Sequence, residues 1–236
     1  LLNDYENPPV IQIPYNPPYY PQLIEAAGYE KEEDHFAYIM DENAELSEKV
    51  IKVADYAKRR GNITLRNPDL KHFDREADLF KEIWNDAWLD NADFVPWTDA
   101  EFDRVAEGLK QIIVPDLAFF AYVNGEPAGV SVAIPNLNEI LFTMNGRLFP
   151  FGIFKLLFGM KKIETLRFIG LGIKDKFKNR GIDALFAVET YRRGRELGYK
   201  KAEFSLILEE NVKLRKALET WGAWPYRTYR VYGKEL

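Results

Sequence analysis

A glycine among basic residues stands at the start of a predicted helix, in the stretch KNRGIDALF at residues 178–186. Gly181 follows Lys178 and Arg180, and the apolar residues after it recur at helical spacing. The free amide groups at a helix amino end attract anions, so this stretch predicts a phosphate site. Asp183 opposes that interpretation, because a carboxylate about 6 Å from a phosphate repels it by up to roughly 3 kcal/mol. The alternative is a plain helix start, in which Asp183 interacts favourably with the helix dipole.

The surroundings of this turn are basic although the whole chain is acidic, with a net charge of -5 and a pI near 5.3. Residues 153–180 hold eight lysines and arginines against Glu164 and Asp175. This local excess favours anion or pyrophosphate binding over a plain helix start. The acidic balance of the chain argues against nucleic acid as a partner, because phosphate-backbone binding needs a broad basic face.

Cysteine is absent, which excludes disulfides, thiolate metal sites and thiol nucleophiles. His35 and His72 have no partner at metal-ligand spacing, so no metal is expected. The lack of cysteine fits a reducing compartment, and we expect a cytoplasmic location. The first residues show no signal peptide, and charged residues, prolines and glycines interrupt the apolar tract 139–160, so no membrane partner is expected.

Hydrophobic periodicity and turn residues predict the elements around the basic turn. A helix over 44–60 is followed by a strand near 62–70 and an amphipathic helix that carries Trp84 and Trp88. Thr98 and Glu101 form a capping box that begins the next helix. The pair of Asn124 and Gly125 predicts a tight hairpin between two further strands.

The second half of the chain predicts a parallel crossover. A strand at 165–175 leads through the basic turn into a helix that ends near Gly198, and a strand follows at 200–208. A helix over 211–222 and a strand over 226–234 complete an order of β-α-α-β-β-β-α-β-α-β from residue 61 onward. The basic turn therefore lies at the carboxyl end of the first crossover strand, where open α/β sheets bind ligands.

This order, with the strand GLGI, the basic glycine turn and Asn211 before a helix that ends in WGA, resembles the GNAT superfamily of acyl-CoA-dependent N-acyltransferases. The resemblance covers roughly residues 61–236. It implies an α/β fold with a mixed, mostly antiparallel sheet, a central parallel crossover and helices on both faces. It also implies acetyl-CoA or another acyl-CoA as co-substrate.

The resemblance assigns binding roles to particular positions. Backbone groups of Leu171, Gly172 and Ile173 would face the pantetheine arm, and Asn211 would contact it in addition to capping its helix. The pyrophosphate would lie on the turn formed by Lys178, Asn179, Arg180, Gly181, Ile182 and Asp183. This turn departs from the family pattern at Lys178, where Gln or Arg is usual, and at Asp183, where a small residue is usual.

Catalysis in this family is a direct attack of the amine on the thioester, which agrees with the lack of cysteine. Leu218 stands where many members carry a tyrosine that protonates the leaving thiolate. Tyr232, with its neighbours Tyr226 and Tyr229, is the substitute we consider, although alternating aromatics on a strand also indicate packing. For the base we prefer Glu209 over Glu210, with a solvated surface role as the alternative.

The acceptor is predicted only as a small-molecule or peptide amine. Asn91, Phe94 and Trp97 lie in the loop between the first two helices, where relatives bind acceptors. The apolar tract 139–162 is longer than a connection needs. It either covers an apolar acceptor or long acyl chain, or packs into the core, or forms the contact of a homodimer.

Residues 16–38 repeat the plan of residues 211–232: an Asn, a helix, a Gly and a later Tyr, with Gly28 matching Gly222. We therefore predict a tandem GNAT-like protein. Residues 1–43 are the C-terminal remnant of a preceding GNAT-like unit, residues 44–60 a connecting helix and residues 61–236 the acyltransferase domain.

Two alternatives to an acyltransferase remain. Asp183 and Leu218 allow a catalytically silent GNAT-like module that binds a ligand or a partner. The tandem plan suggests aminoacyl transfer from tRNA, which the acidic balance disfavours.

Overall fold

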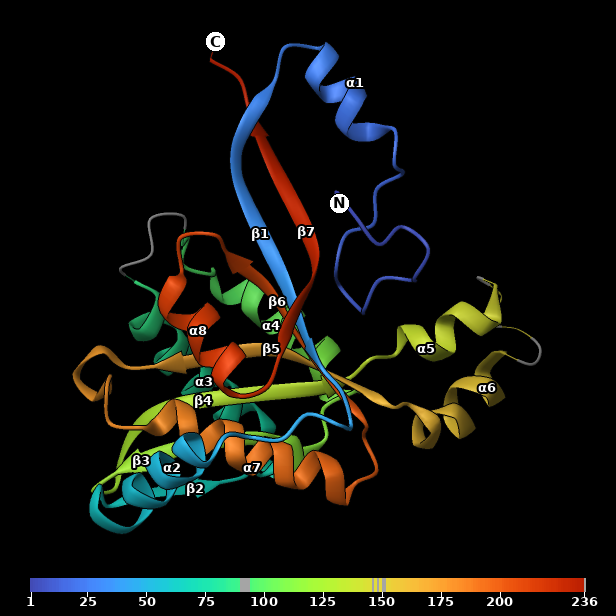
Figure 1. Ribbon diagram of the computed structural model, residues 1–236. Coiled ribbons are helices and arrows are strands. Elements are labelled where there is room, and N and C mark those ends of the chain that lie inside the picture. Colours follow the sequence, from blue (N-terminus) through green and yellow to red (C-terminus); the bar gives the residue numbers. More distant parts are fainter. Residues whose placement is uncertain (90–93, 146, 148, 150–151, 236) are drawn as a thin grey trace. The chain divides into compact units, whose positions relative to one another are not determined.

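The computed structural model describes residues 1–89, 94–145, 147, 149 and 152–235 (Figure 1). The strands are β1 (Glu30–Met40), β2 (Ile63–Arg66), β3 (Ala118–Val123), β4 (Glu126–Pro135), β5 (Thr165–Ile173), β6 (Lys201–Leu208) and β7 (Trp224–Gly233). The α-helices are α1 (Tyr20–Ala26), α2 (Glu48–Arg60), α3 (Phe73–Trp88), α4 (Asp99–Lys110), α5 (Asn138–Leu141), α6 (Gly152–Gly159), α7 (Ile182–Glu196) and α8 (Val212–Thr220).

The strands form one seven-stranded sheet in the order β2-β3-β4-β5-β6-β1-β7. The pairs β2–β3, β3–β4, β1–β6 and β1–β7 are antiparallel. The strands β5 and β6, which α7 connects, make the parallel pair. The predicted fold class, a mostly antiparallel sheet with a central parallel crossover, is therefore confirmed.

The local signals in the sequence form the expected structures. Asn124 and Gly125 both have positive φ, 50° and 83°, as a tight hairpin between right-twisted strands requires. Thr98 and Glu101 form the reciprocal capping box at the start of α4. The side chain of Ser47 caps α2, and that of Asn211 caps α8 by accepting from the Leu214 amide at 3.1 Å.

The chain divides into two compact units. The first unit consists of Leu1–Glu45, Pro135–Arg167 and Tyr199–Leu236, and the second consists of Leu46–Ile134 and Phe168–Gly198. The first unit thus holds β1, β6, β7 and α8, whereas the second holds β2, β3, α2, α3 and α7.

In the second unit, helices cover both faces of the strands, and glycines show which helix lies on which face. A Cβ at Gly170 or Gly172 of β5 would lie 3.0 Å from Trp84 or 3.1 Å from Ala87, both on α3. A Cβ at Gly129 of β4 would instead lie 3.3 Å from Phe186 on α7. The α3 helix approaches one face and α7 the other, and small residues permit both approaches.

In the first unit, β1 lies between β6 and β7, so a strand from the start of the chain separates two strands from its end (Figure 1). His35 is opposite Leu208 of β6 and opposite Tyr229 of β7. Residues 1–13 pack along this part of the sheet, and Leu1, Val10 and Ile13 are buried against Tyr229. These first residues therefore cover part of the sheet, whereas the origin of residues 1–43 in a preceding GNAT-like unit stays a prediction.

The predicted internal repeat has a matching structure. The helices α1 and α8 both end at a glycine with positive φ, 78° at Gly28 and 92° at Gly222. In both, the amide of the next residue bonds the carbonyl five residues back, at 3.3 Å after α1 and 3.0 Å after α8. Each helix then leads into one of the two strands, β1 and β7, that pair with each other.

Candidate functional site

The predicted phosphate turn lies in the second unit, between β5 and α7. Asn179 and Gly181 have the left-handed φ values of 62° and 80°, which reverse the chain before α7 begins at Ile182. No side chain caps this helix, so its first amide groups are not occupied by a capping oxygen. A helix start of this kind favours an anion.

Ion pairs take up part of the basic charge predicted around the turn. Lys174 is 7% exposed and pairs with Glu82 of α3 at 2.5 Å. Lys176 pairs with Glu126, and Lys178 pairs with Asp175 at 2.9 Å. The guanidinium of Arg180 lies 5.5 Å from the ring of Phe177. The positive charge available to a ligand is therefore smaller than the sequence count.

Asp183 occupies the first turn of α7 and is half-buried. Within the part of the chain that the structure describes, it makes no ion pair. A carboxylate in the first helical turn interacts favourably with the helix dipole, which accounts for an acid at this position.

The α2 helix, which the sequence predicted only as a connection, lies against this turn. A Cβ at Gly181 would lie 3.0 Å from Val53 and 3.2 Å from Ala57, so only glycine fits both the space and the positive φ. An open groove of about 540 Å³ runs beside it on α2, lined by Glu48, Lys49, Lys52, Val53 and Tyr56. Sequence reasoning missed these residues, because nothing in a helical pattern shows which turn it contacts.

The strand residues GLGI at 170–173 lie against α3. Gly170 and Gly172 face α3, whereas Leu171 and Ile173 alternate with them and are half-buried. The glycines are thus explained by helix packing, and a role of residues 171–173 toward pantetheine stays a prediction.

Aromatic rings on α3 form a stacked row beside β5. The ring centroids of Phe80 and Trp84 are 5.4 Å apart and those of Trp84 and Trp88 are 4.8 Å apart. Phe94 extends the row at 6.5 Å from Trp88. These four residues are half-buried, so the row presents an apolar surface beside the strand.

Of the three predicted acceptor residues, Phe94 joins this row, and Trp97 is 38% exposed. Asn91 lies outside the described residues.

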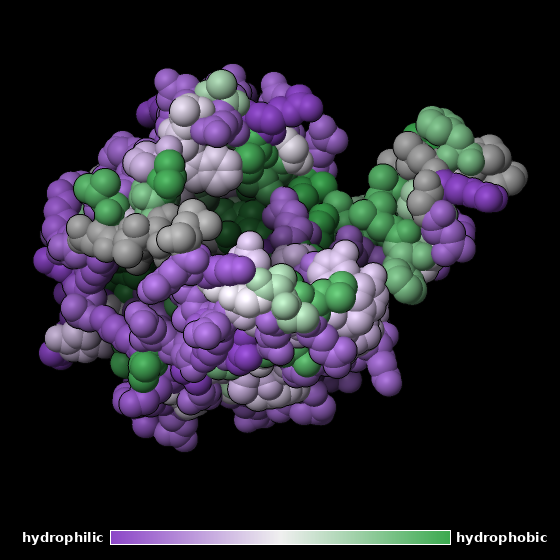
Figure 2. All heavy atoms as spheres, turned by 90° about the horizontal axis from the view of Figure 1, so that it is seen from above, coloured by the Kyte–Doolittle hydropathy of each residue, from purple (hydrophilic) through white to green (hydrophobic). Residues whose placement is uncertain are grey.

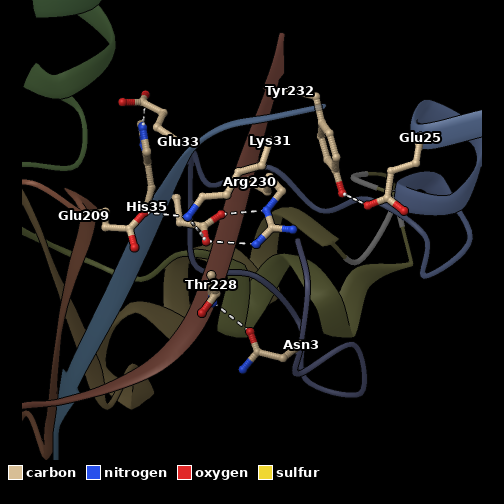
Figure 3. Close-up of polar contacts among 10 residues, drawn as sticks. Asn3, Glu25, Lys31, Glu33, His35, Glu209, Thr228, Arg230 and Tyr232 are labelled. Carbon is tan, nitrogen blue, oxygen red and sulfur yellow. Dashed lines mark hydrogen bonds and ion pairs between the residues drawn. The ribbon is translucent and has the colours of Figure 1, made fainter. Parts of the chain in front are cut away.

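The predicted base Glu209 lies in the first unit and belongs to a chain of ion pairs (Figure 3). The ammonium of Lys31 lies 2.7 Å from Glu209 and 3.0 Å from Asp34. Arg230 holds Asp34 with two hydrogen bonds of 2.8 and 3.0 Å, and this arginine chiefly lowers the pKa of Asp34. A register shift between Lys31 and Glu33 puts Lys31 and Asp34 on one face of β1.

Tyr232 is opposite Lys31 in the β1–β7 ladder and donates from its hydroxyl to Glu25 of α1 at 3.0 Å (Figure 3). Partial burial and this carboxylate raise the pKa of Tyr232. Lys31 therefore pairs with the predicted base Glu209 and lies opposite the predicted acid Tyr232 in the ladder. Lys31 could not be foreseen, because it comes from the opposite end of the chain.

The other two tyrosines considered as acids are packed in the first unit. Tyr229 is 5% exposed, and burial raises its pKa. Tyr226 donates to the Glu203 carboxylate at 3.4 Å. Their burial agrees with packing, the other predicted interpretation.

Glu203 is a buried acid that sequence reasoning missed. It is 0% exposed on β6, and its nearest cation is the Nε of Arg167 at 3.8 Å. Burial raises the pKa of Glu203 to about 7, and Arg167 opposes this only in part. In the sequence, Glu203 has the pattern of an ordinary polar residue of a strand, so its burial is visible only in the packed structure.

No family model matches the chain. Over its whole length the chain is 36% identical to a protein of Caulobacter vibrioides (strain NA1000 / CB15N) named Bacterial ceramide synthase. It is 31% identical to Protein YghO of Escherichia coli (strain K12). The chain spans 63% and 62% of the lengths of these two proteins.

Among solved structures, a GCN5-related N-acetyltransferase from Sphaerobacter thermophilus aligns with 89% of this chain and 54% of its own, at a TM-score of 0.58 and 14% identity. A tandem GNAT protein from the clavulanic acid biosynthesis pathway aligns with 94% and 60%, at a TM-score of 0.54 and 12% identity. The chain has the GNAT fold.

The contact of Gly181 with α2 is one of helix packing, so a role of this turn toward pyrophosphate stays a prediction. Gly181 provides a position where a side chain would not fit, and the uncapped start of α7 provides amide donors. The usual acid of GNAT enzymes is missing, since Leu218 is 1% exposed and packs in the core. Among the described residues, no group of three or more His, Cys, Asp and Glu is arranged for a metal ion.

Proposed function

We propose that the chain is an acyl-CoA-dependent N-acyltransferase that forms an amide from a coenzyme A thioester and a primary amine. The observation that carries this proposal is the 36% identity to a bacterial ceramide synthase over the whole chain, together with the GNAT fold. The second unit would hold the donor, with the turn around Gly181 and the start of α7 on its phosphates.

We further propose a long-chain amino alcohol as the acceptor and a long acyl-CoA as the donor. Ceramides are, as a chemical class, amides of fatty acids with such amino alcohols, and the relative's name denotes their synthesis. The half-buried row of Phe80, Trp84 and Trp88 supports this choice, because it provides an apolar surface for a hydrocarbon chain.

The chemistry requires two proton transfers. The amine nitrogen attacks the thioester carbon, the C–N bond forms, the C–S bond breaks, and coenzyme A leaves as a thiolate. The amine loses a proton to a base, for which we propose Glu209, and the thiolate takes one from an acid, for which we propose Tyr232. Lys31 lies 2.7 Å from Oε2 of Glu209, so the proton would go to the other carboxylate oxygen unless this ion pair opens.

The direct test is an assay with the purified chain, acyl-CoAs from acetyl to palmitoyl, and a series of amines that includes sphinganine. Thiol release and mass spectrometry of the amide are measured together. The expected result is amide formed from the long-chain pair at the highest rate. The proposal would be contradicted if thiol were released but no amide formed, or if no combination of acyl-CoA and amine released thiol.

A silent binding module is the second candidate function, and the burial of Leu218 in place of the usual acid favours it. It predicts that acyl-CoA binds, as measured by calorimetry, while every amine in the series stays unmodified.

The first prediction concerns the turn. Gly181→Ala is expected to weaken acyl-CoA binding about 10-fold, because the new methyl group meets Val53 and Ala57 and strains a residue at φ 80°. Gly198→Ala is the matched control at the other end of α7, since Gly198 has φ 91° but open space around it. Isothermal titration calorimetry measures the affinity of both variants for acyl-CoA. Because both substitutions strain the backbone, equal affinities of the two variants would contradict the assignment of the phosphate site to the turn around Gly181.

The second prediction concerns the base. Glu209→Gln is expected to lower kcat about 100-fold with a smaller change in KM, as removal of a general base does. Glu210→Gln is the control, because it removes the neighbouring carboxylate, which we assign no role. Steady-state rates across pH test the pair. An acidic limb in the profile, meaning a fall in rate as the pH drops, that survives in Glu209→Gln would assign the base elsewhere.

A further inference from the structure

We propose that residues 138–162 dock on the surface of an anionic lipid bilayer. This segment of the first unit contains α5, a 3-10 turn at Phe142–Met144, and α6. The proposal goes beyond acyl transfer and rests on the contacts and exposure of the segment itself.

The inner side of α6 carries glycines. A Cβ at Gly159 would lie 3.0 to 3.1 Å from three atoms of Ile140, and one at Gly152 would lie 2.8 Å from the end of Met144. Ile140 and Met144 are 6% and 8% exposed. Small residues therefore face the neighbouring helix and turn, which is the reverse of an ordinary surface helix with its large apolar residues inside.

Five large apolar residues of the segment are exposed. Phe154 and Phe158 are four residues apart, on one face of α6. The exposed fractions are 40% for Leu141, 68% for Phe142, 73% for Phe149, 56% for Phe154 and 74% for Phe158. Figure 2 shows hydrophobic residues in green gathered over this segment, at the right of the view. Apolar residues gathered in this way on a surface mark an interaction site.

The charge of the segment identifies the partner. Residues 138–162 contain Arg147, Lys155, Lys161 and Lys162 against one acidic residue, Glu139, in a chain with a net charge of -5. The Glu139 carboxylate accepts from the backbone amides of Glu164 and Thr165 at 2.9 and 3.0 Å. The lysines are exposed, and Lys155 donates to the Thr143 carbonyl at 3.0 Å, which keeps its charge near the aromatic residues. Exposed phenylalanines among lysines suit the boundary between anionic headgroups and acyl chains.

A lipid surface fits better than a second copy of the chain. A two-fold interface places the same patch against itself, so the four cations would face one another. None of the described helices is long and apolar enough to cross a membrane, and α6 has only 8 residues. The segment would therefore lie on the bilayer. The expectation of no membrane partner rested on the lack of a span, and surface docking is a separate interaction.

Sedimentation with vesicles tests the proposal. The full chain is expected to sediment with vesicles that contain phosphatidylglycerol and to bind phosphatidylcholine vesicles more weakly. Phe154→Ser with Phe158→Ser is expected to reduce binding about 10-fold or more, because two apolar contacts are lost. Lys161→Glu with Lys162→Glu is expected to remove the preference for anionic lipid.

Tyr19→Ser is the matched control, since Tyr19 is 55% exposed on a different part of the first unit. All of these side chains are exposed, so circular dichroism and thermal midpoints should match the unsubstituted chain. Vesicle binding is measured without substrates, so loss of acyl transfer leaves the result unaffected. Equal binding by the phenylalanine variant, or no binding by the full chain, overturns the proposal. If the chain forms a dimer in the absence of lipid and the double phenylalanine variant abolishes that dimer, the patch belongs to an interface with a second copy.

Discussion

Replacing Arg227 with methionine is expected to lower the free energy of unfolding by about 3 to 5 kcal/mol. Arg227 is 2% exposed on β7, and its Nε lies 2.7 Å from Asp4. It also donates to the carbonyls of Asn7 and Pro8, at 2.7 and 3.2 Å. Methionine keeps much of the volume but leaves these acceptors without their donor, and a buried acceptor without a partner is costly. Denaturant unfolding measures the loss.

Asp4→Asn is the control for the charge alone. It keeps an acceptor near Arg227 and leaves both backbone bonds, and Asp4 has an exposed side-chain fraction of 21%, so a loss of about 1 kcal/mol is expected. Limited proteolysis should cut residues 1–13 faster in Arg227→Met, because this arginine holds them to β7. Equal stability of Arg227→Met and the unsubstituted chain would show that water replaces these bonds.

Glu203→Gln is expected to remove a pH dependence of stability worth about 3 kcal/mol. Burial raises the pKa of Glu203 from 4.5 in the unfolded chain to about 7 in the folded chain. Because the folded state binds this proton more tightly, the stabilisation is complete below pH 4.5 and is lost as the pH rises to 7. Glutamine resembles the protonated acid and does not titrate.

The measurement is the free energy of unfolding from pH 4 to pH 8 in both proteins. The difference between them should grow in favour of Glu203→Gln over the window from 4.5 to 7. Glu164→Gln is a contrasting control, because Lys200 lies 2.6 Å away and lowers the pKa of Glu164. Parallel curves for Glu203→Gln and the unsubstituted chain would mean that Arg167 already compensates the buried charge.

Much of the fold could be predicted because its signals are local. The capping box at Thr98, the hairpin at Asn124 and the cap at Asn211 each depend on a few neighbouring residues. The glycine turn before α7 belongs to the same class, since the positive φ at Gly181 arises within the turn. The predicted element order from residue 61 agrees with the structure except between β4 and β5, where α5 and α6 lie in what the sequence predicted only as an apolar tract.

The candidate site was predictable only in part. The basic count around the turn overstated the free charge, because Lys174 and Lys178 pair with Glu82 and Asp175. The place of Glu209 at a strand end is visible in the sequence, but its partner Lys31 is remote in sequence. Ion pairs between distant residues produce no periodic pattern in the sequence, so they cannot be predicted from it.

The sequence by itself determined most helices and strands from residue 61 onward, the hairpin at Asn124 and a parallel crossover with a basic turn at its end, since each depends on short-range sterics and hydrogen bonding. Tertiary structure alone decided that β1 lies between β6 and β7, that Glu203 is fully buried, and that α6 turns its phenylalanines outward. Strand neighbours, burial and charge pairing depend on which distant segments meet. That outcome minimises the free energy of the whole chain, and no single stretch encodes it.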